Sequence, residues 1–391
     1  MIKPHILFFI FGFIYYLIIP IAIGSFEVMI DMPGMISWQD TFNSAQTNLP
    51  NYFFIITAFF IAFLSGSSLR YNIFLGRRKT VNLSEKNKKI DLRITALIFL
   101  FIVLYFIANN LGLLFTGYET YDLVLLGAMA TINSVSTVLL IYVLLNSKVS
   151  NLQSWLFFIS IIFCSVFLIG LGSRMYVLIP IIAIATYKFY YARVRWKGNI
   201  FYLYFALVII LLLMIGTLRI GEHLTLDFLA YLLFAEPTYT WWSTGSFLSL
   251  NQLLALDFPS NYISSFLNFL PNFLIDDKQS LIQLIRDKYF YISPLGADSI
   301  FVSIQGNFGW FLGFFFMLLV GFFYASIETL SKRSNFFMAY YIGIVSVLPF
   351  QFFRDGFGIL NKQLFWNMLI VPAMLIFISI LISKLASVSK N

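Results

Sequence analysis

Charge is scarce in this sequence, and so are the residues that usually build metal or thiol chemistry. Only 11% of the 391 residues are charged, whereas 60% are hydrophobic. A soluble domain carries roughly a quarter charged residues, so a soluble globular fold is excluded. The single cysteine, Cys164, rules out a disulfide framework and a paired-thiol metal site. With two histidines, no HExxH motif and no acidic pair in a polar loop, we expect chemistry that needs neither a metal nor a cofactor.

The hydrophobic residues come in long runs with no period-2 alternation. Runs of about 20 residues are typical of helices that cross a bilayer of roughly 30 Å, and not of an outer-membrane barrel. The sequence predicts an all-α polytopic integral membrane protein in which residues 1–391 form a single transmembrane domain. We expect about ten transmembrane helices, each of about 18 to 25 residues. They begin near Ile6, Tyr52, Ile94, Leu123, Trp155, Met175, Ile200, Ile300, Phe336 and Leu364.

The distribution of charge predicts the orientation of the helices. If the N-terminus is cytoplasmic and the helices alternate, most lysines and arginines fall on the cytoplasmic side, and most acidic residues fall outside. Basic residues favour the cytoplasmic side of bacterial membrane proteins, so both termini are predicted to be cytoplasmic. The net charge of +8 therefore has an explanation other than nucleic-acid binding. The first apolar block, from His5 to Gly24, lacks a clear cleavage site and is expected to be a retained helix.

One long stretch, residues 220–297, falls outside the membrane in this topology. It is rich in Trp, Tyr, Phe and Pro, which is too aromatic for a disordered segment. We interpret it as a large extracytoplasmic loop with short helices that lie on the outer membrane interface or dip into it. The part from Asp227 to Trp242 is apolar enough to re-enter the membrane.

Three arginines lie at outer helix ends, where the positive-inside rule does not expect them. Arg174 occurs in "IGLGSRMY", Arg219 in "TLRIGEH" and Arg354 in "QFFRDGFG". The planar guanidinium group binds phosphate through two parallel hydrogen bonds and keeps its charge. Together the three predict a phosphate or diphosphate site. Each arginine on its own is equally explained by contacts with lipid headgroups or by an ion pair, as between Arg354 and its neighbour Asp355.

Four outer acidic residues are candidates for acid–base chemistry. A carboxylate at the mouth of a membrane bundle is costly and so suggests a function. Asp298 is the first candidate for a general base, followed by Glu222 and Glu236. Asp298 is equally suited to cap the helix that follows it, and Glu222 to be an exposed loop residue. The fourth acid, Asp355, is expected to form an ion pair with Arg354. His223, beside Glu222, is interpreted as a polar loop residue.

The order of these segments resembles a known family. "IGLGSRMYVLIPIIA", "TLRIGEH", "ADSIFVSIQGNFGWFLG" and "FFRDGFGILNKQLFWN" are similar, in this order along nearly the whole chain, to motifs of the Wzy-type polymerases of bacterial polysaccharides. The resemblance extends more remotely to O-antigen ligases. It implies a GT-C-like membrane glycosyltransferase in the bacterial cytoplasmic (inner) membrane.

The resemblance also implies an activity and partners. Such enzymes join oligosaccharide repeat units carried on undecaprenyl diphosphate into surface polysaccharide, either O-antigen or capsule, without a metal. Arg174, Arg219 and Arg354 would then bind the diphosphate, while Asp298, Glu222 or Glu236 would serve the acceptor hydroxyl. Expected partners are the lipid-linked oligosaccharide, membrane lipid, a chain-length regulator and a flippase.

Two departures from the family keep alternatives open. Asp298 stands eleven residues before Gly309, where the ligases usually have a histidine, which weakens a ligase interpretation. Arg286 precedes Gly296 one residue too closely for the Arg-x10-Gly pattern of some polymerases. A lipid-linked oligosaccharide flippase is the main competitor, although transporters usually show two similar halves and none is evident. An acyltransferase or a non-catalytic assembly subunit are further alternatives.

Overall fold

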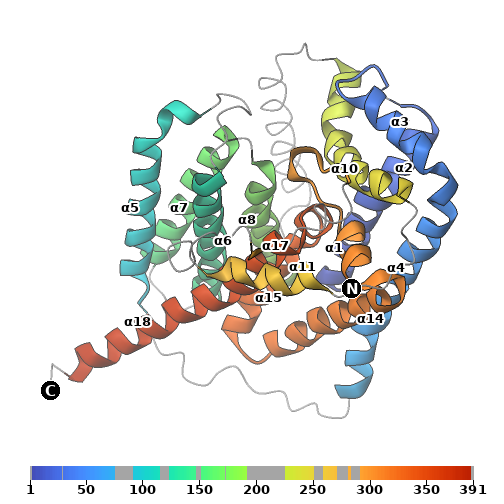
Figure 1. Cartoon of the computed structure of the whole chain (residues 1–391). Helices are drawn as coiled ribbons and strands as arrows, with labels where there is room; N and C mark the ends of the chain where they lie inside the picture. Colours follow the sequence, from blue (N-terminus) through green and yellow to red (C-terminus); the bar gives the residue numbers. More distant parts are fainter. Residues whose placement is uncertain are drawn as a thin grey trace. The chain divides into compact units, whose positions relative to one another are not determined.

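The computed structural model describes residues 2–28, 30–74, 91–114, 123–146, 151–171, 173–191, 225–250, 259–270, 281–282 and 291–388. In these ranges the structure is helical and contains no strand (Figure 1). The chain divides into two compact units. Unit 1 consists of Met1–Arg77, Ile209–Ser326 and Leu348–Lys362, and unit 2 of Arg78–Val208, Ile327–Val347 and Gln363–Asn391. The single domain predicted for 1–391 stays a prediction.

A multi-pass membrane protein is confirmed by the lengths and composition of the helices. Among the described residues, six helices are long and apolar enough to cross a membrane: Pro4–Ser25, Met35–Arg70, Leu125–Leu145, Leu152–Gly170, Ile300–Ser331 and Phe357–Leu385. The helices Arg93–Asn109 and Asn335–Val347 occupy two more predicted spans but are shorter. The span predicted from Ile200 lies outside the described residues. Ten crossings therefore stay a prediction.

Unit 1 begins with a helix that changes its winding. α1 (Pro4–Phe13) continues into a π-helical turn, η1 (Ile14–Ile18), and then into α2 (Ile19–Ser25). Pro20 lies in the first turn of α2 and has no backbone N–H, so the regular hydrogen-bond ladder cannot pass through it. The π-helical turn lies immediately before this break. Within that turn, the carbonyl of Leu17 accepts a hydrogen bond of 3.1 Å from the Tyr52 hydroxyl.

Glycines let α4 (Leu49–Phe74) and α14 (Ile300–Ser331) pack very closely in unit 1. A Cβ atom on Gly66 would lie 1.9 Å from the Leu318 carbonyl oxygen, and one on Gly321 would lie 2.1 Å from that of Phe63. Ser67 donates a hydrogen bond to the Gly321 carbonyl at 3.3 Å. In lipid, where apolar side chains gain little by leaving their solvent, such small residues hold helices together through close backbone contact.

A 24-residue helix, α10 (Leu226–Ser249), lies within the predicted outer loop and is longer than the short helices expected there. Tyr231 and Tyr239 both donate to the Pro33 carbonyl, at 3.1 and 2.9 Å, and Asn48 donates to the Leu248 carbonyl at 2.8 Å. Pro33 and Asn48 flank α3 (Met35–Ala45), which lies between α2 and α4. Because both halves of α10 contact the residues that flank α3, α10 packs along α3.

α14 is folded back on itself near its N-terminus. Gly309 has φ 62° and ψ −176°, a conformation essentially restricted to glycine. Beyond it, a Cβ atom on Gly313 would lie 2.8 Å from Ile304 Cγ2, although residues nine apart in a continuous helix are separated by about 13 Å. Residues 300–307 are all buried. The predicted eighth span therefore consists of a short buried helix, a sharp break and a long helix.

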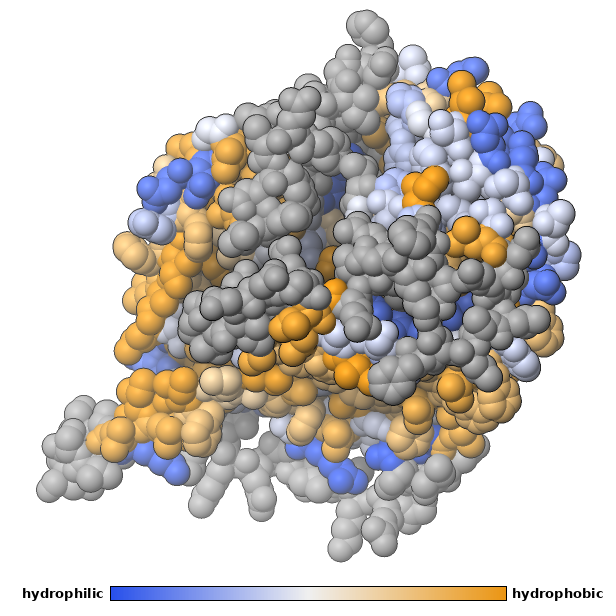
Figure 2. Space-filling view, viewed as in Figure 1, coloured by the Kyte–Doolittle hydropathy of each residue, from blue (hydrophilic) through white to orange (hydrophobic). Residues whose placement is uncertain are grey.

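Unit 2 is a bundle around α6 (Leu123–Leu145), α7 (Asn151–Gly170) and α8 (Arg174–Thr186), joined by α5 (Arg93–Asn109) and α15 (Asn335–Val347). In Figure 1, α5, α6, α7 and α8 run side by side. Figure 2 shows apolar surface over α5 and over α18 (Val371–Val388). Exposed apolar side chains such as Phe101 (70%) and Phe377 (60%) are expected where a helix faces lipid.

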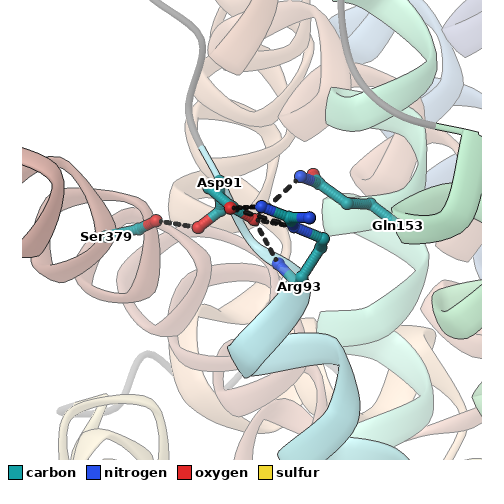
Figure 3. Close-up of polar contacts among 4 residues, drawn as sticks. All are labelled: Asp91, Arg93, Gln153 and Ser379. Carbon is teal, nitrogen blue, oxygen red and sulfur yellow. Dashed lines mark hydrogen bonds and ion pairs between the residues drawn. The ribbon is translucent and has the colours of Figure 1, made fainter.

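A polar clip closes one end of unit 2 (Figure 3). Asp91 accepts hydrogen bonds from the backbone and side chain of Arg93 and, at 3.0 Å, from Gln153 Nε2 of α7. Its backbone carbonyl accepts from the Ser379 hydroxyl of α18 at 2.5 Å. The start of α5, the start of α7 and the middle of α18 thus lie together. The hydrogen bonds from Arg93 hold the pKa of Asp91 below its usual value.

Candidate functional site

Four of the six predicted site residues are described: Glu236, Asp298 and Arg354 in unit 1, and Arg174 in unit 2. Arg219 and Glu222 lie outside the described residues, as does His223. The convergence of three arginines on one anion therefore stays a prediction. Unit 1 does bring together residues that are far apart in sequence, since Glu236 and Arg354 form an ion pair across 118 positions.

Glu236 lies in the interior of α10, directly before a proline. Pro237 follows it inside the helix and cannot donate to the carbonyl of Leu233. That carbonyl accepts a hydrogen bond from the Tyr15 hydroxyl instead, at 2.5 Å. Thr238 and Thr240 donate back to the carbonyls of Phe234 and Glu236, a pattern that tends to bend helices. The local sequence thus places a partly exposed carboxylate where the helix is least regular.

Arg354 lies between two carboxylates. Its Nε donates to Glu236 Oε1, and its Nη1 donates to Asp355 Oδ1 at 2.8 Å. The Asp355 side chain is 2% exposed, that of Arg354 is 20% exposed and that of Glu236 is 40% exposed. The ion pair between Arg354 and Asp355 that the sequence predicted is therefore confirmed. With two acids and one base, the cluster carries more negative than positive formal charge.

Burial and charge set the protonation of this cluster. Burial raises the pKa of Asp355 above its usual value, and the charge of Arg354 opposes that rise. Burial alone would lower the pKa of Arg354, but Glu236 and Asp355 raise it well above its usual value. Arg354 is consequently charged at every physiological pH. Removing it would leave a deeply buried carboxylate without its counter-charge.

Asp298 lies against the same loop. Its Oδ1 accepts a hydrogen bond from the Tyr291 hydroxyl at 2.9 Å. A Cβ atom on Gly356, two residues beyond Arg354, would lie 3.2 Å from Asp298 Oδ2 and 3.7 Å from Ser303 Oγ. The missing side chain at position 356 is what lets the loop approach the carboxylate this closely. Asp298 thus faces the segment that carries Arg354 and Asp355.

The capping role considered for Asp298 is filled by its neighbour. In the first turn of α14 the N–H of Phe301 donates to Ser299 Oγ at 3.3 Å. The N–H of Ser299 in turn donates to Ser243 Oγ of α10 at 2.9 Å. The carboxylate of Asp298 is directed instead toward Tyr291 and Gly356.

Arg174 begins α8 in unit 2. The start of α8 lies beside the interior of α6 and not beside the start of α6. Asn133 Nδ2 donates to the Tyr176 carbonyl at 2.9 Å, and the Tyr187 hydroxyl donates to the Leu144 carbonyl at 3.2 Å. α8 therefore runs parallel to α6, with its residue 176 level with residue 133. At 1.5 Å per residue, the level of Arg174 along the axis of α6 is therefore about 12 Å from that of Leu123. Among the described residues, no carboxylate pairs with it.

These contacts distinguish the two described arginines. Arg354 is neutralised by protein carboxylates, whereas Arg174 has no such partner among the described residues. An arginine inside a membrane-spanning bundle is costly unless water or an anion reaches it. Tyr291 and Tyr15, which orient Asp298 and the Glu236 turn, were not predicted. Neither lies in a motif, so only their three-dimensional contacts identify them.

Comparison with known proteins adds no family to these observations. No protein-family model, curated protein or solved structure matches the chain.

Proposed function

We propose that this protein is a glycosyltransferase of the cytoplasmic membrane of a bacterium that polymerises undecaprenyl-diphosphate-linked oligosaccharide repeat units into surface polysaccharide. The order of the motifs in the sequence suggests the substrate. The observation that supports the chemistry is the placement of Asp298 against the loop of Arg354 and Asp355 in unit 1. The site would face the outside of the membrane, where the charge distribution predicts these segments to be.

In this reaction the acceptor hydroxyl oxygen forms a bond to the anomeric carbon of the donor sugar. The bond between that carbon and the diphosphate oxygen breaks, and the diphosphate leaves with the electron pair. Asp298 accepts the proton of the acceptor hydroxyl. A positioned general base contributes typically 10²- to 10⁴-fold to the rate.

Arginine would stabilise the charge that develops on the leaving diphosphate. A preorganised guanidinium does this without reorganising water in the transition state. Arg354 is held in place by Asp355 and is fully charged, so it suits this role. Arg174 and Arg219 keep the same predicted role, each from its own segment. Among the described residues Arg174 has no carboxylate partner, which supports anion binding in unit 2.

The proposal is tested by the length of the polymer made in cells. We expect Asp298→Asn, Arg354→Ala and Arg174→Ala proteins to yield only single repeat units at normal expression. Asp40→Asn is the matched control for Asp298→Asn, because Asp40 is exposed on α3. Arg93→Ala is the control for the two arginines, since Arg93 forms a surface ion pair with Asp91. Normal long polymer from the three site variants would refute the proposed site.

A further inference from the structure

The two carboxylates that bind Arg354 are not equivalent. Asp355 is the adjacent residue and its side chain is 2% exposed, so it is a fixed part of the arginine's surroundings. Glu236 reaches Arg354 from α10 and its side chain is 40% exposed. A carboxylate that is exposed to this extent can turn to solvent at little cost, because partly exposed ion pairs contribute little to stability.

Glu236 also occupies a particular part of the guanidinium group. It accepts from Nε, while Asp355 accepts from Nη1, so two different edges of the fork are used. A phosphate normally binds such a fork through two parallel N–H groups. In the described structure the Nε edge is already taken by a carboxylate oxygen. A phosphate can bind there only if Glu236 leaves.

From these contacts we propose that Glu236 is a displaceable placeholder for the substrate diphosphate on Arg354. Without substrate, Glu236 neutralises the Nε edge of the arginine. The incoming diphosphate replaces it, and the Glu236 carboxylate is released into the site. This inference rests on the proposed function, because it assumes that Arg354 binds the diphosphate.

Displacement has a consequence that a purely structural ion pair does not have. Since Glu236 and the diphosphate compete for one edge, removing Glu236 must strengthen diphosphate binding. The gain in diphosphate affinity equals the free energy of the lost Glu236–Arg354 pair. For a partly exposed pair this corresponds to roughly two- to five-fold. A structural tether would give the opposite result, because the loop would lose order and bind more weakly.

The experiment measures binding of inorganic diphosphate to the purified full-length protein by calorimetry, with Glu236→Gln, Glu236→Ala, Asp298→Asn and Arg354→Ala variants. We expect both Glu236 variants to bind two- to five-fold more tightly than the wild type. Asp298→Asn removes a neighbouring negative charge without touching Arg354 and controls for a general electrostatic effect, so a smaller change is expected. Size-exclusion chromatography confirms that each variant is folded.

The outcomes separate the placeholder from the function on which it rests. Unchanged or weaker binding by both Glu236 variants, with binding lost in Arg354→Ala, would refute the placeholder and leave the arginine site standing. An equal gain in Asp298→Asn would also refute it, because the effect would then be general. Binding that survives Arg354→Ala would remove the arginine from the diphosphate site, and the proposed role of Arg354 with it.

Discussion

Replacing Arg354 with alanine should destabilise the protein in proportion to how deeply its two partners are buried. Glu236 is 40% exposed and can turn to solvent, so its contribution is at most about 1 kcal/mol. Asp355 is 2% exposed and would be left as an uncompensated charge. Breaking one partner of such a buried pair typically costs about 3 to 5 kcal/mol.

Protonation of Asp355 limits the stability that the Arg354→Ala protein can lose. An isolated buried Asp355 can become neutral, and the free energy of protonating a carboxyl with an ordinary pKa of 3.8 at pH 7 is about 4 kcal/mol. At pH 5 the same limit is about 2 kcal/mol. Because the pKa of a buried Asp355 is raised, its penalty is present above the unfolded pKa and fades as the pH falls toward it. The destabilisation should therefore be about 3 to 4 kcal/mol at pH 7 and roughly half of that at pH 5.

The assay is reversible unfolding in mixed detergent micelles, followed by circular dichroism at both pH values. The double variant Arg354→Ala/Asp355→Asn should recover most of the lost stability, because both charges are then gone. Arg93→Ala serves as the matched control: its ion pair with Asp91 joins side chains that are 52% and 44% exposed. A loss from Arg354→Ala no larger than that from Arg93→Ala, or a loss that does not shrink at pH 5, would refute the reasoning.

Three further predictions concern the backbone, the clip of unit 2 and the topology. Gly309→Ala should lower the free energy of unfolding by about 1 to 3 kcal/mol, because alanine disfavours the backbone conformation at the break in α14. Gly112→Ala is the control and should be nearly neutral, since a Cβ atom there meets nothing within 4 Å. Unfolding measurements on both variants test this. Because the pKa of Asp91 is lowered, its stabilising effect should be present above the ordinary carboxyl pKa and lost as the pH falls below it, so wild type and Asp91→Asn should converge in stability toward acid pH. In intact cells, a membrane-impermeant thiol reagent should label Ile36→Cys but not Ser383→Cys, both exposed positions, and the reverse pattern would invert the predicted orientation.

The sequence predicts most clearly what depends on length and composition. Apolar runs predict the helices from Pro4, Leu152 and Ile300, because a spanning helix must satisfy its own backbone hydrogen bonds over the full thickness of the bilayer. α10 is harder to predict, since Pro237 and its polar neighbours argue against a 24-residue helix. In the structure the helix continues through Pro237, and the Tyr15 hydroxyl donates to the Leu233 carbonyl that Pro237 cannot reach.

In the candidate site, contacts between neighbours in sequence could be predicted, whereas contacts between distant residues could not. The pair of Arg354 and Asp355 follows from their adjacency and was predicted. The pair of Glu236 and Arg354 joins positions 118 apart, and no local pattern indicates it. The approach of Asp298 to Gly356 likewise depends on how α14 folds back at Gly309. A glycine within an apolar run does not show on its own which way the chain will turn.

The proposed function is tested most directly by a reaction with purified protein and lipid-linked repeat units. We predict a ladder of polymers of increasing length without ATP, an ion gradient or an acyl donor, and its loss in the Asp298→Asn protein while Asp40→Asn retains it. Failure of the folded wild-type protein to form any ladder, or an undiminished ladder from Asp298→Asn, would contradict it.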